Sequence, residues 1–274
     1  KECDWSSDVC SSDLLLPVPD IDRTDFMLIL GGNPLVSRGS MMTAPDITTR
    51  LKAVVERGGQ VVLIDPRKTE TASVATSHHY IRPGTDAVLL LAMLNVLFAE
   101  GKVDLGRLAA FTDGADRLTE AASSFTVERA ATVTGIEAAA IRALALAFAA
   151  AKSAVCYGRV GVSTQEFSTL TQWLVNCLNI VTGNLDREGG AMFTTPAVDP
   201  LPYVGRGHLG KWQSRVRGLP EFGGELPVAV LAEEMLTPGE GQVKGLITSA
   251  GNPVLSTPNA RAKLKKRFTS FWRV

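Results

Sequence analysis

Acidic, basic and glycine residues follow several apolar runs of the chain, where such residues can recognise a nucleotide. Asp65 comes directly after one apolar run, and a carboxylate there can accept hydrogen bonds from a ribose diol. Arg67 offers a planar guanidinium group, which suits stacking on a purine or pairing with a phosphate. Asp86 can accept hydrogen bonds from the amino and imino protons of a guanine edge. Gly84 and Gly158 would let backbone N–H groups approach a diphosphate closely.

Each of these residues also has a purely structural interpretation. An Asp-Pro pair after a strand is often only a turn starter, and Asp86 is more often a helix N-cap. The glycine pair at Gly31 is a tight turn in most proteins. No G-x-G-x-x-G fingerprint follows these strands, and Asp65 lies further from Gly31 than the roughly 20 residues of the usual NAD pattern, which disfavours an ordinary NAD dehydrogenase. His78 and His79 point to opposite sides of a strand and cannot easily share one metal ion.

These residues are expected on the loops of an α/β fold, because strand and helix signals alternate along the chain. Short continuous apolar runs are typical of strands that are buried on both faces of a parallel sheet. The fold class is therefore predicted to be α/β, with parallel Rossmann-like sheets and flanking helices. Strands are predicted at residues 26–30 and 60–64, around Tyr80 and Ile81, and at residues 154–157. Helices are predicted from Thr43 as N-cap to Gly58, from Thr85 or Asp86 to Glu100, through an all-helical insertion at 102–151 with caps near Thr126 and Thr134, and at 168–181.

A strand, a Gly-Asn-Pro turn and a helix start occur twice in the chain. The first copy carries Asn33 and Ser37, and the second carries Asn252 and Ser256. The repeat predicts two pseudo-equivalent cofactor-binding halves, the second with a strand around Ile247. Chance similarity between two strand–loop–helix units is the alternative, and the shared Gly-Asn-Pro with a following serine makes this alternative less favoured.

The composition limits the classes of partner. Lys and Arg number 28, as do Asp and Glu, so that the net charge is zero and neither a nucleic acid nor an anionic membrane is an expected partner. No stretch approaches the roughly 20 uninterrupted apolar residues of a membrane helix, so direct membrane insertion is not expected. Cys156 and Cys177 are too far apart for a C-x-x-C motif, and we expect both to be buried, unreactive thiols.

Residues 1–14 fit poorly with the rest of the chain. They show no periodicity, and Asp8 to Leu14 read as the translation of a common sequencing adapter, so we expect a non-native segment there. The tail from Lys263 to Val274 is basic and aromatic, and is either divergent or a second disturbance of the reading frame. Between them we expect an α/β dinucleotide-binding domain at 15–190, a Gly- and Pro-rich loop region at 191–240, and the truncated start of a second α/β half at 241–274.

Taken together, these motifs resemble those of the dimethyl-sulfoxide-reductase superfamily of molybdopterin oxidoreductases, which includes formate dehydrogenases and nitrate reductases. The order and approximate spacing of the motifs agree over nearly all of residues 25–259. The Asp-Pro-Arg and Arg-Pro-Gly-Thr-Asp pair is fairly specific, whereas the Asn-Pro loops alone are not. The matching stretches are residues 30–34, 62–72, 81–86, 161–165, 182–185 with 189–190, and 251–253.

The resemblance implies two molybdopterin guanine dinucleotides that clamp one molybdenum or tungsten ion, each held by one half of an α/β core. It implies that the Asp-Pro-Arg and Arg-Pro-Gly-Thr-Asp motifs hold one guanosine end, and that residues 158–165 approach the pterin and the metal. Asn33 and Asn252 would shape two equivalent loops. The candidate cofactor-binding residues are Asn33, Pro34, Ser37, Asp65, Arg67, Pro83, Gly84, Asp86, Gly158, Gly161, Gln165 and Asn252.

The resemblance also implies parts that this chain does not contain. In that family the metal-ligating Cys, selenocysteine, Ser or Asp lies upstream of the Asn33 region, and a 4Fe-4S cluster is expected in the missing N-terminal part. We therefore expect a fragment of a larger multidomain enzyme, inactive alone, without a catalytic or metal-ligating residue of its own. The full-length protein is expected to carry out two-electron redox chemistry on a small formate- or nitrate-type substrate, with an electron-transfer partner protein or subunit. A cytoplasmic location is expected, with the periplasm left open.

Two alternatives remain at this point. One is a molybdenum-free electron carrier of the same fold family, such as the large iron–sulfur subunit of respiratory NADH dehydrogenase. The candidate loop residues that this chain keeps, Asp65, Arg67, Asp86 and Gln165, argue moderately against that alternative. The other is the middle domain of a thiamine-diphosphate enzyme, which does not predict the Gly-Asn-Pro repeat.

Overall fold

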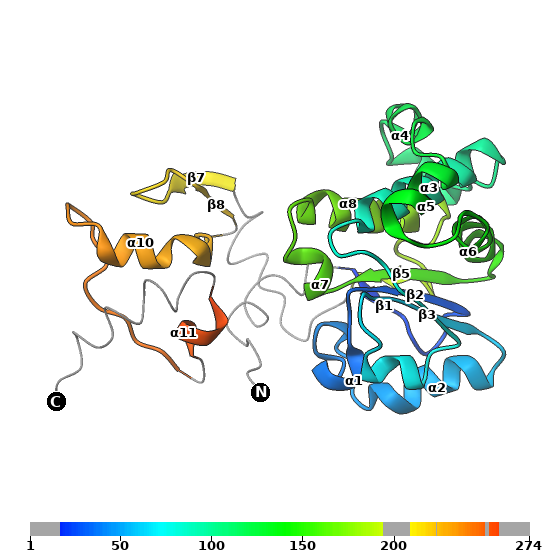
Figure 1. Ribbon diagram of the computed structural model, residues 1–274, viewed down its shortest axis with the longest axis horizontal. Coiled ribbons are helices and arrows are strands. Elements are labelled where there is room, and N and C mark those ends of the chain that lie inside the picture. Colours follow the sequence, from blue (N-terminus) through cyan, green and yellow to red (C-terminus); the bar gives the residue numbers. More distant parts are fainter. Residues whose placement is uncertain (1–16, 194–208, 223, 250–251, 258–274) are drawn as a thin grey trace. The chain divides into compact units, whose positions relative to one another are not determined.

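The computed structural model describes residues 17–193, 209–222, 224–249 and 252–257. The chain divides into two compact units, and Leu16–Thr194 forms the larger (Figure 1). The predicted adapter segment at 1–14, the tail from Lys263 and Gly251 of the second Gly-Asn-Pro lie outside the described residues.

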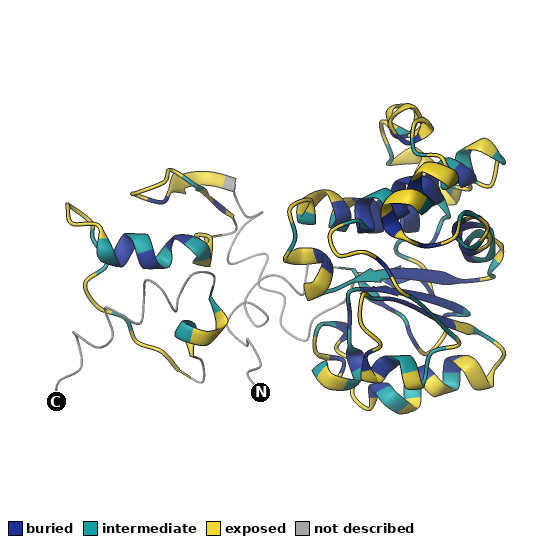
Figure 2. Cartoon of the chain, viewed as in Figure 1, coloured by how far each residue is buried: buried dark blue, intermediate teal, exposed yellow. Residues whose placement is uncertain are grey.

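A four-stranded parallel sheet forms the centre of the larger unit. Its strands are β2 (Phe26–Leu30), β3 (Gln60–Ile64), β4 (Ser77–His79) and β5 (Ala154–Gly158), in the order β4-β3-β2-β5. All five residues of β2 are buried, as expected for an inner strand that is covered on both faces (Figure 2). The predicted parallel α/β fold is therefore confirmed.

The edge strand β4 differs from its prediction. We expected it around Tyr80 and Ile81, but the strand is Ser77–His79, and the Tyr80 side chain is 60% exposed. The register is set just before the strand, where Thr76 bonds to Val61 through its backbone N–H (2.8 Å) and accepts the Val61 N–H at its hydroxyl (3.0 Å). An edge strand made of Ser and His has no apolar signal in the sequence.

Helices cover both faces of the sheet. On one face, α2 (Ile47–Glu56) packs its Ile47, Leu51 and Val54 against β2 and β3, beside the short α1 (Pro34–Ser37). The other face carries a larger apolar core, in which Phe148 meets Phe26 edge-on at a ring distance of 5.7 Å. The helices of this second layer are α3 (Asp86–Ala99), α4 (Ala115–Ser123), α5 (Val127–Thr134), α6 (Ala138–Ala150) and α8 (Ser168–Val181).

Two of the predicted helix caps were wrong. Thr43 ends the 3-10 turn η1 (Ser40–Met42), and α2 begins after Asp46, because both residues adopt left-handed backbone angles (φ 50° and 52°). Thr134 is the last residue of α5 rather than a cap of the next helix, and its hydroxyl donates to the carbonyl of Ala130 at 2.8 Å. The cap at Thr126 is confirmed, since its side chain accepts from a backbone N–H of the first turn.

The outer edge of β5 is closed by an asparagine side chain instead of another strand. The Asn179 amide accepts the Cys156 N–H at 2.8 Å and donates to the Cys156 carbonyl at 2.9 Å. Next to it, Asn184 accepts the Ala154 N–H at 3.1 Å. These contacts satisfy the buried backbone groups that an edge strand would otherwise leave unpaired.

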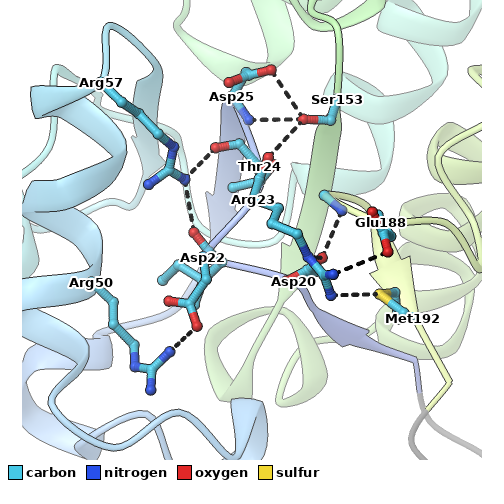
Figure 3. A network of polar contacts seen from close by, with 12 residues as sticks. Asp20, Asp22, Arg23, Thr24, Asp25, Arg50, Arg57, Ser153, Glu188 and Met192 are labelled. Carbon is cyan, nitrogen blue, oxygen red and sulfur yellow. Dashed lines mark hydrogen bonds and ion pairs between the residues drawn. The ribbon is translucent and has the colours of Figure 1, made fainter.

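The amino edge of the sheet is tied together by the segment that leads into β2. Strand β1 (Val18–Pro19) pairs antiparallel with β6 (Ala191–Met192), so that the chain enters and leaves the unit side by side. The following segment, residues 20–25, bonds to neighbouring elements on both sides (Figure 3). Arg57 of the α2 end donates to the Ile21 carbonyl at 2.9 Å, and Ser153 donates to the Asp25 carboxylate at 3.2 Å.

In the described part of the smaller unit, a hairpin of β7 (Leu209–Gln213) and β8 (Pro220–Phe222) lies within the region predicted as loop, because its many glycines mask the alternation of a strand. Two short turns, η4 (Val228–Val230) and α10 (Leu231–Leu236), follow it. The second Asn-Pro starts α11 (Pro253–Ser256), with Asn252 as its N-cap. The predicted strand around Ile247 is not formed; this side chain is 97% exposed, and no described strand pairs with it.

Within the described ranges, no single helix is long and apolar enough to cross a membrane. Helices α5 and α6 together are long and apolar enough by length and composition, but a bend of 113° separates them.

Candidate functional site

All four strands of the parallel sheet end in candidate loops. The first Asn-Pro follows β2, Asp65 follows β3, the Arg-Pro-Gly-Thr-Asp motif follows β4, and the loop from Gly158 follows β5. Because the strands are parallel, these loops share the carboxyl edge of the sheet, which is where open α/β sheets bind ligands.

Asn33 joins the loop after β2 to the loop after β3. Its amide nitrogen donates to the Glu70 carboxylate at 2.8 Å, and its amide oxygen accepts from the Thr71 hydroxyl at 2.8 Å. The hydrogen bond from Asn33 lowers the pKa of Glu70. The amide is therefore occupied within the protein, and Asn33 fixes the shape of the two loops.

Asp65 is held at three of its four polar positions. Its N–H donates to the His79 carbonyl (3.2 Å), its carbonyl lies 3.0 Å from His78 Nε2, and its Oδ1 accepts the Arg67 N–H at 2.8 Å. The remaining carboxylate oxygen, Oδ2, has no hydrogen bond within the described chain. Asp65 therefore starts the turn, as its structural interpretation requires, and still presents one oriented acceptor.

Asp86 is a buried carboxylate beside the loop that follows β5. It is 5% exposed, and Gln165 Nε2 donates to its Oδ2 at 3.1 Å. Burial raises the pKa of Asp86, and the negative charge of Asp65 raises it further. A Cβ atom added at Gly84 would lie 3.6 Å from the Gln165 side-chain oxygen. The structure therefore brings Gly84, Asp86 and Gln165 together.

The loops after β2 and β5 meet backbone to backbone. Gly161 donates its N–H to the Gly31 carbonyl at 2.9 Å, and a Cβ atom at Gly31 would lie 2.8 Å from Gly161 Cα. Gly31 also has a φ of 55°, which favours glycine. Neither position accepts a side chain, so the two glycines let the loops close against each other.

The side chains of the other candidates make no hydrogen bond to Asp65, Asp86 or Gln165 in the described part of the chain. Arg67 has a 72% exposed side chain, 3.9 Å from Glu70, and Pro83 is exposed. Pro34 is buried at the start of α1, and Ser37 donates its backbone N–H to the Asn33 carbonyl. Gly158 ends β5, where an added Cβ would lie 2.9 Å from Val162. Asn252 belongs to the smaller unit.

Sequence reasoning missed three residues of this edge. His78 holds the Asp65 turn, Glu70 receives the Asn33 amide, and Thr69 has a buried hydroxyl without a hydrogen-bond partner. Thr69 and Glu70 stand inside the stretch that continues the Asp-Pro-Arg motif, so the motif itself was a signal for them. Among the described residues, no group of three or more His, Cys, Asp or Glu side chains could hold a metal ion.

The model of one protein family, described as molybdopterin oxidoreductase, matches residues 5–269. The chain belongs to the molybdopterin oxidoreductase family. The resemblance that its motifs indicate is thereby confirmed, and the members of this family that it matches include oxidoreductases.

Individual members of the molybdopterin oxidoreductase family agree with this assignment. Formate dehydrogenase H of Escherichia coli is 30% identical over 170 residues, which cover 62% of this chain and 23% of that protein. The assimilatory nitrate reductase catalytic subunit of Bacillus subtilis is 26% identical over 279 residues, covering 93% and 38%. The solved structure of acetylene hydratase from Pelobacter acetylenicus is similar with a TM-score of 0.54 and 26% identity, covering 61% of this chain and 22% of that chain. The chain thus spans well under half the length of these relatives.

Proposed function

We propose that the whole protein is a bis-molybdopterin guanine dinucleotide oxidoreductase, acting on a small formate- or nitrate-type substrate at molybdenum or tungsten. This chain would contribute the loops that hold one guanosine end of the cofactor. The observation that carries the proposal is the pair of carboxylates at the carboxyl edge, Asp65 with one unused oxygen and Asp86 buried against Gln165.

The two carboxylates suit a ligand that is rich in hydrogen-bond donors. A guanine edge and a ribose diol present such donors, and a carboxylate accepts through either oxygen. Burying a carboxylate is costly unless it is hydrogen-bonded, and Gln165 supplies only one side-chain bond to Asp86. A donor from the ligand would therefore stabilise the charged form of Asp86, because burial disfavours that form and raises the pKa of Asp86.

The glycine contacts and the basic residues of the same edge fit the rest of a dinucleotide. Gly84 leaves its backbone exposed, and Arg67 extends into solvent beside the motif. These are the features expected for close approach of a diphosphate. When bound, the cofactor supplies the two-electron redox chemistry at its metal, while this chain binds and orients it. The metal ligand and a 4Fe-4S cluster would come from other parts of the whole protein.

A molybdenum-free electron carrier is the second candidate function. It shares the fold, but it gives no reason for a buried carboxylate that faces a ligand edge.

The relative from Bacillus subtilis is called a catalytic subunit, which supports an electron-transfer partner for this protein as well. We propose a cytoplasmic location.

Metal and nucleotide analysis of the whole-length protein that contains this chain tests the proposal. We expect molybdenum or tungsten, with about two GMP released per chain after acid hydrolysis of the cofactor. The matched variants are D86N at the site and D113N at an exposed, distant aspartate. D86N should lower the GMP content and D113N should not. Iron–sulfur without molybdenum, tungsten or GMP would support the electron-carrier function instead.

A further inference from the structure

The strand order places a topological switch point between β2 and β5. From β2 the chain runs through α2 to β3 and then β4 on one side, and β5 lies on the other side of β2. The connections therefore diverge at the carboxyl ends of β2 and β5. In open α/β sheets, ligands bind in the crevice at this point.

Arg159 is the first residue after β5 and lies at this switch point. Its N–H donates to the Leu30 carbonyl at 3.1 Å, and its own carbonyl accepts the Val162 N–H at 2.9 Å, so its backbone is fixed by both loops. Its side chain lies on Gly32, where an added Cβ would come within 3.3 Å of Arg159 Cβ. One guanidinium nitrogen donates to the Ser40 hydroxyl at 3.2 Å.

No carboxylate in the described part of the chain pairs with Arg159. The residue is half-buried, and within those residues its guanidinium bonds only to the neutral Ser40 hydroxyl. One of its five N–H donors is thus used, and the other four can donate to an anionic group. Other arginines do form ion pairs with carboxylates: Arg23, Arg50, Arg107, Arg142 and Arg215.

We propose that Arg159 binds an anionic oxygen group of a ligand at this switch point, beside the contact between the loops after β2 and β5. Two sources fit this chemistry, a phosphate of the cofactor or the oxyanion of a formate- or nitrate-type substrate. The choice of sources rests on the proposed function, whereas the anion-binding role rests on the position and the unpaired charge of Arg159. Arg67 is a weaker candidate, because it is 72% exposed and lies 3.9 Å from the Glu70 carboxylate.

The test compares four variants of the whole-length protein with the unmodified protein. R159M removes the charge, R159K keeps it without the planar fork, and G32A leaves the arginine but crowds its side chain. The matched control is R187M, because Arg187 is exposed and donates to the Lys152 carbonyl, just before β5 begins and away from the carboxyl edge. Circular dichroism first checks that each variant is folded, and the R159K and G32A proteins keep the test decisive if R159M does not fold.

The readouts are GMP and metal content, and the KM and kcat for formate or nitrate. If the anion is a phosphate of the cofactor, R159M should lower the GMP content while R187M does not. If it is the substrate, GMP should be unchanged and KM should rise about tenfold or more, as expected for loss of a hydrogen bond to a charged group. R159K should lie between R159M and the unmodified protein. Unchanged GMP content and unchanged KM in R159M would overturn the proposal.

A separate arm decides the role of Arg159 if the unmodified protein contains no molybdenum, tungsten or GMP. In that case the proposed function fails, and this chain is titrated with pyrophosphate and with formate by calorimetry. Binding of either anion that is about tenfold weaker in R159M, and unchanged in R187M, would still support an anion site. Equal binding by R159M, or no binding of either anion, would overturn it.

Discussion

Replacing Asn179 should lower the free energy of unfolding by more than the loss of a side chain of this size alone would. The side chain is 1% exposed, and both of its amide groups bond to the backbone of Cys156, at 2.8 and 2.9 Å. In N179A two hydrogen bonds are lost, and a buried N–H and a buried carbonyl are left without partners. Each unsatisfied group costs about 1–3 kcal/mol, so we expect the free energy of unfolding to fall by about 2–6 kcal/mol.

The assay is urea denaturation of this chain, followed by circular dichroism, together with hydrogen exchange at the Cys156 amide. N179L fills the space without the hydrogen bonds, and should be destabilised by a similar amount. N176A is the matched control on the same helix, because Asn176 is half-buried and its side chain donates to the Gln172 carbonyl of its own helix. It should cost less than about 1 kcal/mol. An N179L protein as stable as the unmodified chain, with an equally slow Cys156 amide, would refute the reasoning.

Three further predictions concern titratable groups. In N33A the pKa of Glu70 should rise towards its usual value in an NMR titration, because the hydrogen bond from Asn33 that lowers this pKa most is lost. In the unmodified chain, ionised Glu70 gives a small stabilisation above its unfolded-state pKa, and this stabilisation is lost as the pH falls through its folded-state pKa. In N33A this stabilisation should vanish. Burial raises the pKa of Asp86, so the free energy of unfolding falls as the pH rises from the unfolded-state pKa through the folded-state pKa of this carboxyl. D86N cannot ionise and should therefore be more stable than the unmodified chain at neutral pH. Urea titrations should also show a flatter pH dependence for D86N. Burial raises the pKa of Cys177 to about 12 and that of Cys156 further still, so neither thiol should react with iodoacetamide at pH 8 until the protein is denatured, as read by mass spectrometry; labelling of either in the native chain would contradict the buried placement.

The sequence predicted the inner parts of the fold well, because burial on both faces leaves a clear pattern. Strands β2 and β3 and helix α8 have the predicted bounds. It placed β4 around Tyr80 and Ile81 instead of at Ser77–His79, because Ser77 and the two histidines form a polar edge strand whose position depends on Thr76 and Val61. It also placed the α2 cap three residues too early, since the left-handed conformation of Asp46 leaves no mark in the residue type.

For the site, the sequence indicated which loops meet but not how they are held. Parallel strands bring Asp65 and Asp86 to one edge, and that followed from the order of the elements alone. The contact of His78 with the Asp65 carbonyl and the unpaired state of Arg159 depend on side-chain positions in three dimensions. No spacing rule relates residues that become neighbours only when strands pair in the order β4-β3-β2-β5.

The pairing of β1 with β6 has a mechanical consequence. Val18 lies opposite Met192 and Pro19 opposite Ala191, so the outer ends of both strands point the same way. Tension applied through the flanking polypeptide would break the hydrogen bonds of this short pair one after another. The four-stranded sheet would bear the tension only after the pair had separated. Movements of neighbouring parts of a longer protein would then be absorbed at this pair, and the loops at the carboxyl edge would keep their shape.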